Sequence, residues 1–220
     1  MKQGLRTILL LFLSSIMLLT PFTALAEATP TPLQTVAQAY QAVLGAQTPY
    51  TFCAEGVSAQ LTFGRSVTEW NGYSFTDPYS YKRFCLTDLD ADNLPEVVLE
   101  LSDAQGTPFG FILLRYEGGV VYGFPFVYRA MEWITLEGDV FFSNGAADNG
   151  WGRLHFAAGT VTMQPVCAMQ TDGNTVRYTI AGKAVTEKEY TAYTEQLQQK
   201  KQPVWLAFDT KTVQKVFAQF

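Results

Sequence analysis

Hydrophobic positions change their spacing twice along this chain. Apolar side chains recur every three or four residues from Leu33 to Leu44, as expected of a helix with one buried face. From about Phe52 to Ile180 apolar and polar residues alternate, with turn residues roughly every 8–12 positions, which is typical of short antiparallel strands. Helical spacing returns after Thr186. The pattern therefore predicts a helix, a long series of strands, and then helices again.

Local signals mark where the helices begin. Thr31 precedes a proline that suits the first turn of a helix, so it is the expected cap of the N-terminal helix. Thr186 and Glu189 form the S/T-x-x-E pattern of a capping box, which predicts the start of a second helix. A third helix is expected to begin at Asp209 or Thr210 and to run to the end of the chain.

Glycine-containing turns divide the central region into hairpins. These turns are Glu117-Gly118-Gly119, Ala158-Gly159 and Ala181-Gly182. We expect roughly six to nine strands between the helices, connected as a meander. The predicted fold class is therefore α+β, with an N-terminal helix, a central antiparallel β-sheet meander and two C-terminal helices.

The N-terminus has the three parts of a secretory signal peptide. Lys2 and Arg6 precede an apolar run from Ile8 to Leu19, and Ala24-Leu25-Ala26 has the small residues of a cleavage site. We expect residues 1–26 to be removed after Ala26, leaving a short leader over residues 27–32 and a single domain over residues 33–220. The apolar run is short for a membrane span, so the mature protein is predicted to be secreted, without membrane insertion after cleavage.

Charge argues against nucleic acid as a partner. Loss of Lys2 and Arg6 lowers the number of basic residues from 15 to 13 against 20 acidic ones, so the mature chain has a formal net charge of −7. Phosphate recognition needs clustered Lys and Arg, and this chain offers only scattered ones. The three cysteines, Cys53, Cys85 and Cys167, allow three alternative single disulfides, among which the sequence does not choose.

An acidic segment provides the strongest candidate for a metal site. Oxygen ligands in the order of a calcium loop are offered by Asp88, Asp90, Asp92, the carbonyl of Leu94, and Glu96. The position of the bidentate glutamate in an EF-hand loop falls on Leu99, so a calcium site here would be weak. The alternative is a hydrated turn, in which Asp88 and Asp92 bind backbone amides, Asn93 takes the left-handed conformation and Glu96 faces water.

The same segment carries a resemblance. Residues 86–99, LTDLDADNLPEVVL, resemble the D-L-D-G-D-G-x-P-E-L loop of FG-GAP and VCBS-type calcium repeats, which also occurs in uncharacterised secreted proteins of Gram-positive gut bacteria. Ala91 and Asn93 replace the two glycines of that motif. The segment from Leu136 to Arg153 is similar to the second half of those bacterial proteins. The resemblance implies a calcium loop; without internal repeats it does not extend to a propeller fold, and it brings no activity.

A second candidate site lies in the glycine-rich segment from Asn144 to Trp151. It combines an aromatic ring with polar groups, a mixture that suits a sugar ligand. The candidate ligand-binding residues are Asp148, Asn149, Trp151 and Arg153. The alternative is a hairpin connection whose tryptophan packs on the sheet. The aromatic run Trp70, Tyr73, Phe75, Tyr79 and Tyr81 is interpreted as packing.

These features favour a secreted, non-enzymatic protein, stabilised by calcium at the acidic loop, that binds an extracellular or cell-surface glycan, peptide or protein. One alternative is a secreted hydrolase that uses carboxylates near the segment from Asn144 to Trp151. Its chemistry would need two carboxyls about 5–10 Å apart across a cleft, which neighbouring aspartates of one loop do not supply. The other alternative is a structural module of an envelope assembly, which a closed surface with one large apolar patch would support.

Overall fold

The computed structural model describes residues 31–220, apart from residues 55, 65, 71–72, 146–147, 158 and 174. The predicted signal peptide, and the predicted leader as far as residue 30, lie outside the described residues. Within the described part of the chain, no helix combines the length and the apolar character needed to cross a bilayer.

The N-terminal helix α1 (Pro32–Leu44) begins where the sequence predicts it. Thr31 and Gln34 form a reciprocal capping box, and Gly45 follows the last turn. One face of the helix is buried, and the Tyr40 hydroxyl on that face accepts a hydrogen bond of 2.9 Å from the backbone N–H of Tyr116. The helix is thus both packed on and hydrogen-bonded to the neighbouring sheet.

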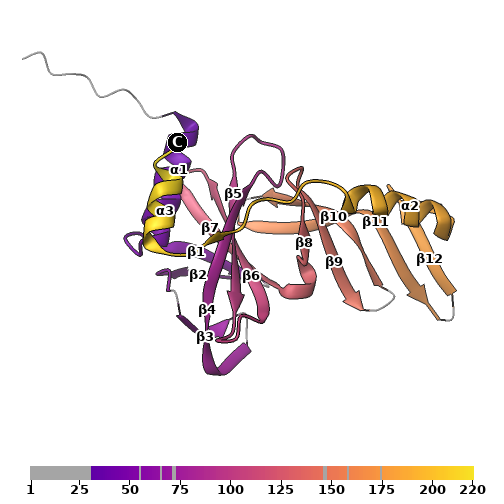
Figure 1. Cartoon of the computed structure of the whole chain (residues 1–220), viewed down its shortest axis with the longest axis horizontal. Helices are drawn as coiled ribbons and strands as arrows, with labels where there is room; N and C mark the ends of the chain where they lie inside the picture. Colours follow the sequence, from indigo (N-terminus) through magenta and orange to yellow (C-terminus); the bar gives the residue numbers. More distant parts are fainter. Residues whose placement is uncertain are drawn as a thin grey trace, which may run out of the picture.

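The first sheet contains eight strands, most of them antiparallel neighbours in the chain (Figure 1). Its strands are β1 (Tyr50–Ala54), β2 (Val57–Leu61), β3 (Ser66–Trp70), β4 (Tyr73–Thr87), β5 (Glu96–Ser102), β6 (Pro108–Glu117), β7 (Val120–Val127) and β14 (Leu206–Ala207). Their order is β14-β4-β5-β6-β7-β1-β2, and β3 pairs with β4. The pairing of β1 with β7 is parallel.

The second sheet contains six strands in the order β13-β12-β11-β10-β9-β8. They are β8 (Trp133–Ile134), β9 (Asp139–Gly145), β10 (Asp148–Ala157), β11 (Thr160–Asp172), β12 (Thr175–Ile180) and β13 (Lys183–Val185). A short 3-10 helix, η1 (Tyr128–Ala130), leads from the first sheet to the second. Helix α2 (Glu187–Gln198) packs on the second sheet, whereas α3 (Thr210–Phe217) returns to lie beside α1 (Figure 1).

The predicted α+β class is wrong, although all three helices were predicted. Strands make up 53 % of the structure and helices only 20 %, so the fold is mainly β. The strands also form two sheets instead of one. Alternation of polar and apolar residues predicts that a strand has one buried and one exposed face, but it does not predict which other strand pairs with that strand. The helices therefore cover the two ends of a two-sheet structure and do not form a layer over a single sheet.

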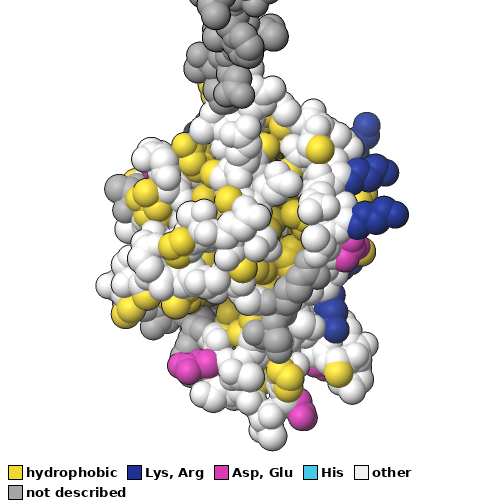
Figure 2. Space-filling view, turned by 90° about the vertical axis from the view of Figure 1, so that its left-hand side faces the viewer, with side chains coloured by type: hydrophobic (Ala, Val, Ile, Leu, Met, Phe, Trp, Pro, Cys, Tyr) yellow, Lys and Arg dark blue, Asp and Glu magenta, His cyan; other side chains and the backbone are white. Residues whose placement is uncertain are grey.

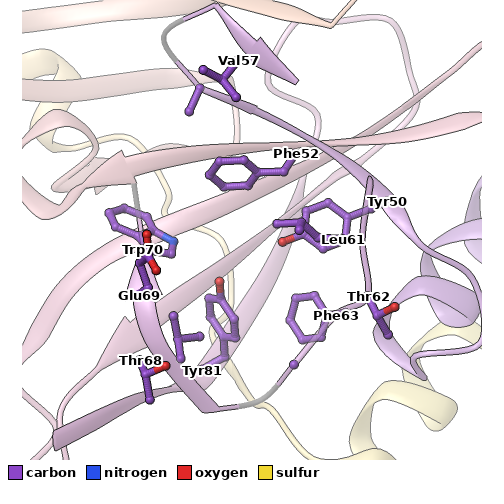
Figure 3. Close-up of a pocket in the computed structure, with 13 residues that line it drawn as sticks. Tyr50, Phe52, Val57, Leu61, Thr62, Phe63, Thr68, Glu69, Trp70 and Tyr81 are labelled. Atoms are coloured by element: carbon purple, nitrogen blue, oxygen red, sulfur yellow. The ribbon is translucent and has the colours of Figure 1, made fainter. Parts of the chain in front are cut away.

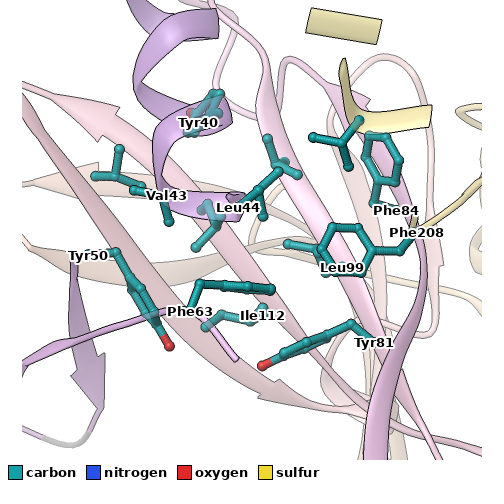
Figure 4. Close-up of a cluster of buried hydrophobic side chains, with 14 of the residues drawn as sticks. Tyr40, Val43, Leu44, Tyr50, Phe63, Tyr81, Phe84, Leu99, Ile112 and Phe208 are labelled. Carbon is teal, nitrogen blue, oxygen red and sulfur yellow. The ribbon is translucent and has the colours of Figure 1, made fainter. Parts of the chain in front are cut away.

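Three apolar clusters hold the layers together. The largest lies between the first sheet and helices α1 and α3 (Figure 4). The second joins the two sheets, and the third lies between the second sheet and α2. Strand β5 is buried on both faces, because Val97 and Leu99 point into the first cluster while Val98 points into the second.

The three cysteines are free thiols, so the disulfide that the sequence allows between Cys53 and Cys85 is not formed. Cys85 and Cys167 are buried within the second and third clusters, where burial raises the pKa of both thiols. They behave as small hydrophobic residues of the core.

The capping box of α2 is confirmed and gives a first testable prediction. The Thr186 hydroxyl accepts a hydrogen bond from the backbone N–H of Glu189, and the Glu189 carboxylate accepts one from the backbone N–H of Thr186. We expect Thr186→Ala to lower the free energy of unfolding by about 1 kcal/mol, measured by urea denaturation. Thr191→Ala, at an exposed position within the same helix, is the control and should cost nothing. Equal losses in the two variants would contradict the assigned role of the cap.

Candidate functional site

The acidic loop connects β4 to β5 and lies where the first sheet meets the second. The residue at the centre of its contacts is Arg115, on β6. Strand β6 is the second strand after β4 in the chain and pairs with β5 in the sheet. The guanidinium carbon of Arg115 lies 4.6 Å from the centre of the Phe156 ring, which belongs to β10 of the second sheet. An arginine that was not part of the predicted site is therefore at its centre.

Arg115 forms ion pairs with three carboxylates of the loop. Its Nη1 lies 2.7 Å from Asp90 and 2.8 Å from Glu96, and its Nη2 lies 3.1 Å from Asp92. The arginine is 9 % exposed, so these contacts are shielded from water. Removing one partner from such a buried group is more costly than breaking an exposed pair, because the remaining buried charges are left uncompensated.

Backbone amides satisfy most of the remaining carboxylate oxygens. Asp88 accepts hydrogen bonds from the N–H groups of Asp92 and Asn93, at 3.2 and 2.9 Å. Asp92 accepts one from Leu94, and Glu96 accepts one from Leu89, both at 2.8 Å. These bonds agree with the turn interpretation of Asp88 and Asp92. The turn interpretation also expected Glu96 to face water, and this expectation is wrong because the Glu96 side chain is buried.

Burial alters the acidity of two of these carboxyls. It raises the pKa of Glu96 from 4.5 to about 8, and nearby Asp90 adds to the rise, against the opposing effects of the Leu89 hydrogen bond and Arg115. Burial also raises the pKa of Asp90, in spite of the attraction of Arg115. Ionised carboxylates are therefore unfavourable at these two positions, and the positive charge of Arg115 offsets this cost only in part.

The geometry gives a test of the calcium hypothesis. Carboxylate oxygens of Asp88, Asp90 and Glu96 lie within 4.8 Å of one another, so these three could approach one ion. Calcium takes six to eight oxygens. Both oxygens of Glu96 already bind Arg115 or a backbone amide, and Asp90 contributes the one buried carboxylate oxygen of the loop without a partner, its Oδ1. The donor set does not fit a cation while Arg115 holds these groups, and calcium binding stays a prediction.

The two residues of the loop that stand at the glycine positions of the motif both have a positive φ. Ala91 has φ 63° and Asn93 has φ 67°, both in the left-handed region. Asparagine tolerates this conformation, whereas alanine is strained in it because its Cβ approaches the following carbonyl oxygen. The expected left-handed conformation of Asn93 is thus confirmed.

The strain at Ala91 leads to a second prediction. Ala91→Gly should raise the free energy of unfolding by about 1 kcal/mol, because the relief of left-handed strain exceeds the added entropy of the unfolded chain. Ala104→Gly, at an exposed turn position without positive φ, should instead be neutral or destabilising. Urea denaturation of both variants measures the difference. A loss of stability in Ala91→Gly would contradict the strained backbone.

The residues of the second candidate site make contacts within the second sheet and with helix α2. Trp151 is 1 % exposed and packs edge-on against Phe141, while the Arg153 guanidinium binds Asp139 at 2.9 Å. Asp148 opens β10 opposite Gln170 in the strand register. Asn149 lies next along the strand, and its backbone carbonyl lies 3.5 Å from the Tyr190 hydroxyl, which donates to it. The ligand-binding role of this set stays a prediction, and the burial of Trp151 counts against it.

A cleft that the sequence did not reveal lies beside β1, β2 and β3 (Figure 3). Its volume is about 650 Å³. Among the described pairings, β2 joins only β1, and β3 joins only β4, so the sheet stays open between β2 and β3. Alternate residues of β1, namely Tyr50, Phe52 and Ala54, form one wall, and Trp70 and Tyr81 form the opposite side.

Two glycines leave space for two of the aromatic rings of the cleft, those of Tyr50 and Trp70. A Cβ atom on Gly123 would lie 2.5 Å from the Tyr50 ring, and one on Gly110 would lie 2.7 Å from the Trp70 ring. Both rings therefore rest directly on the backbone of neighbouring strands. The packing role predicted for Trp70 and Tyr81 is confirmed by their exposures of 4 % and 7 %, but the same rings also border the cleft.

No family model, no curated protein and no solved structure matches this chain. The functional argument therefore depends on the geometry of the acidic loop and of the cleft.

Proposed function

We propose that this is an exported, non-enzymatic binding protein whose ligand occupies the cleft beside β1, β2 and β3. The observation that carries the proposal is the cleft itself. A volume of about 650 Å³, walls that are mostly aromatic and aliphatic, and a few inward-pointing polar atoms are the usual properties of a ligand pocket. Export is proposed from the N-terminal sequence, and the ligand is then an extracellular one.

The residues around the cleft favour binding over catalysis. Among the described lining residues Glu69 is the one carboxylate, and it is exposed. Hydrolysis of a glycosidic bond normally needs two carboxyls facing each other. The carboxylates of the acidic loop are engaged by Arg115 and by backbone amides, so in this proposal the loop is a structural brace between the sheets.

The structural-module alternative is less well supported. It would be favoured by a closed surface, whereas this protein has an open cleft bordered by exposed apolar side chains. Val57 and Leu61, both on β2, are 64 % and 40 % exposed and lie at this cleft. Exposed apolar residues gathered at a concave site indicate a ligand more often than a packing defect.

Thermal unfolding in the presence of defined ligand classes tests the proposal. The purified protein is melted with pools of neutral small molecules, oligosaccharides and unstructured peptides, beside the Val57→Asp variant. At least one class should raise the melting temperature of the wild type but not of Val57→Asp, because bound ligand stabilises the folded state. Val204→Asp, which changes a 75 % exposed valine outside the cleft, should respond like the wild type. The proposal fails if no class stabilises the protein, or if Val57→Asp responds fully.

A further inference from the structure

We propose that the cleft binds an uncharged small molecule with an apolar body and an oxygen acceptor, and that this oxygen accepts a hydrogen bond from Nε1 of Trp70. The inference depends on the proposed function and adds the chemical class of the ligand. Its observations are the apolar walls, one buried donor without a partner, and the absence of a buried charge among the described lining residues.

The walls supply an apolar environment on both sides. Phe52, Val57 and Leu61 lie along the β1–β2 side, and Figure 3 shows the Phe52 side chain directed toward the ring of Trp70. Val57 and Leu61 are the two large apolar residues of β2 that remain exposed. An apolar ligand body would remove them from water, which is the main favourable contribution in such sites.

The buried donor selects for an acceptor. Trp70 is 4 % exposed, and its Nε1 is buried without a hydrogen-bond partner. The nearest acceptor is the Tyr81 hydroxyl, whose pKa is raised by burial and lowered to a smaller extent by a weak hydrogen bond from Trp70. This contact is too poorly aligned to satisfy Nε1. In Figure 3 the indole nitrogen and the hydroxyls of Tyr50 and Tyr81 all point toward the same space. A buried N–H without a partner is costly in free energy, so a ligand that places an oxygen acceptor at this point binds more tightly.

The cleft offers little compensation for the charge of an ionic ligand. Burial raises the pKa of Tyr50 to about 12 and that of Tyr81 further, so both hydroxyls are neutral at physiological pH. No lysine, arginine or histidine is among the described lining residues. Figure 2 shows that the face above α1, α3 and β2 is mostly apolar and uncharged polar, with the charged side chains near its margins. An anion entering this cleft would lose its hydration without gaining an opposite charge. A cation would meet only Glu69, which is exposed and therefore screened by water.

The shape of the cleft favours a small molecule over a sugar or a peptide. Sugars stack on aromatic faces that are open to solvent, but Phe63, Trp70 and Tyr81 are at most 7 % exposed. The volume of about 650 Å³ is within the range for compact ligands, roughly 300–1,000 Å³. A peptide would instead have to add a strand at the open edge of β2, which a point change at Trp70 would affect little.

The test uses 6-propionyl-2-(dimethylamino)naphthalene, a neutral fluorescent ketone whose emission shifts when it leaves water. We expect saturable binding with a stoichiometry of one, a blue shift, and energy transfer from tryptophan. Val57→Asp should weaken binding at least tenfold, since it places a charge on the apolar wall, whereas Val204→Asp should stay within twofold of the wild type. Trp70→Phe keeps a ring but lacks the donor, so it should weaken binding by roughly five- to tenfold, the loss of one hydrogen bond. Leu61→Glu provides a second wall variant if Trp70→Phe unfolds.

Two comparisons separate this inference from the broader proposal. The anionic dye 8-anilinonaphthalene-1-sulfonate should bind at least tenfold more weakly than the neutral ketone, and equal binding would overturn the uncharged class. The inference also fails if the ketone does not saturate, or if Val57→Asp and Val204→Asp bind it equally. If oligosaccharides or peptides then stabilise the wild type but not Val57→Asp, the binding function stands with a different ligand. If nothing stabilises the wild type, both fall.

Discussion

Replacing the buried Arg115 with methionine is expected to lower the free energy of unfolding by about 3–5 kcal/mol at pH 8. The methionine fills a similar volume, so the loss reports charge and hydrogen bonding more than packing. Without the guanidinium, Asp90 and Glu96 keep their buried positions but lose the cation that lies 2.7 and 2.8 Å from them. An uncompensated buried carboxylate is the source of the cost.

A matched control is available at Arg153. This arginine also binds a buried carboxylate, that of Asp139 at 2.9 Å, but its own side chain is 50 % exposed. Asp139 has a second cation, Lys200, at 2.6 Å. Arg153→Met should therefore cost about 1 kcal/mol or less, because Asp139 stays paired. Urea denaturation of both variants at the same pH gives the comparison.

A second-site change distinguishes the ionic explanation from a packing defect. Adding Glu96→Gln to Arg115→Met removes one of the carboxylates that lost its partner, so part of the lost stability should return. Recovery larger than the gain from Glu96→Gln alone indicates direct coupling between the two residues. If the double variant is no more stable than Arg115→Met, or if Arg153→Met costs as much as Arg115→Met, the acidic loop is not held by Arg115 in the way described.

The helices could be predicted because their signals are local. Thr31 and Thr186 each form a capping box with the residue three positions later, so a short window of sequence contains all of the interacting groups. Asp209 likewise caps α3, and its carboxylate accepts the backbone N–H of Thr212. Such contacts need no knowledge of the rest of the fold.

The division into two sheets could not be predicted in the same way. Strand β1 pairs in parallel with β7, about seventy residues later, and β4 pairs with β14 near the C-terminus. The alternation of side chains from Tyr50 to Ala54 does not predict that β7 is the neighbour of β1. The cleft arises from the same non-local choice, because it is the space left where β2 and β3 do not meet.

The acidic loop shows how a motif can be found without its partner. The spacing of Asp88, Asp90 and Asp92 predicts either a cation site or a hydrated turn, and the resemblance implies calcium. The structure supplies a guanidinium from β6, which reaches the loop only because β5 lies between β4 and β6 in the sheet. In the sequence Arg115 is a single charged residue after the apolar run Phe111–Leu114, and no spacing links it to the aspartates of the loop.

The dependence of stability on pH follows from Glu96. Its pKa is 4.5 in the unfolded chain and about 8 in the folded protein, raised chiefly by burial. Between these values the folded state holds a proton that the unfolded chain has lost, so stability is greatest at the acidic end of this window and falls as pH rises toward 8. We expect a loss of roughly 3 kcal/mol between pH 5 and pH 8, less than the full shift implies because this range covers only part of the titration between the two pKa values.

Glu96→Gln removes this titration and should make the stability nearly independent of pH over the same window, whereas Glu132→Gln, at an exposed position, should leave the slope of the wild type unchanged. Arg115→Met should steepen the slope, because the ionised Glu96 then has no cation beside it and its pKa rises further. Urea denaturation of the four proteins at pH 5, 6.5 and 8 measures these slopes. A stability of the wild type that rises with pH would mean that the ion pair with Arg115 outweighs burial, and that Glu96 is held as the carboxylate throughout.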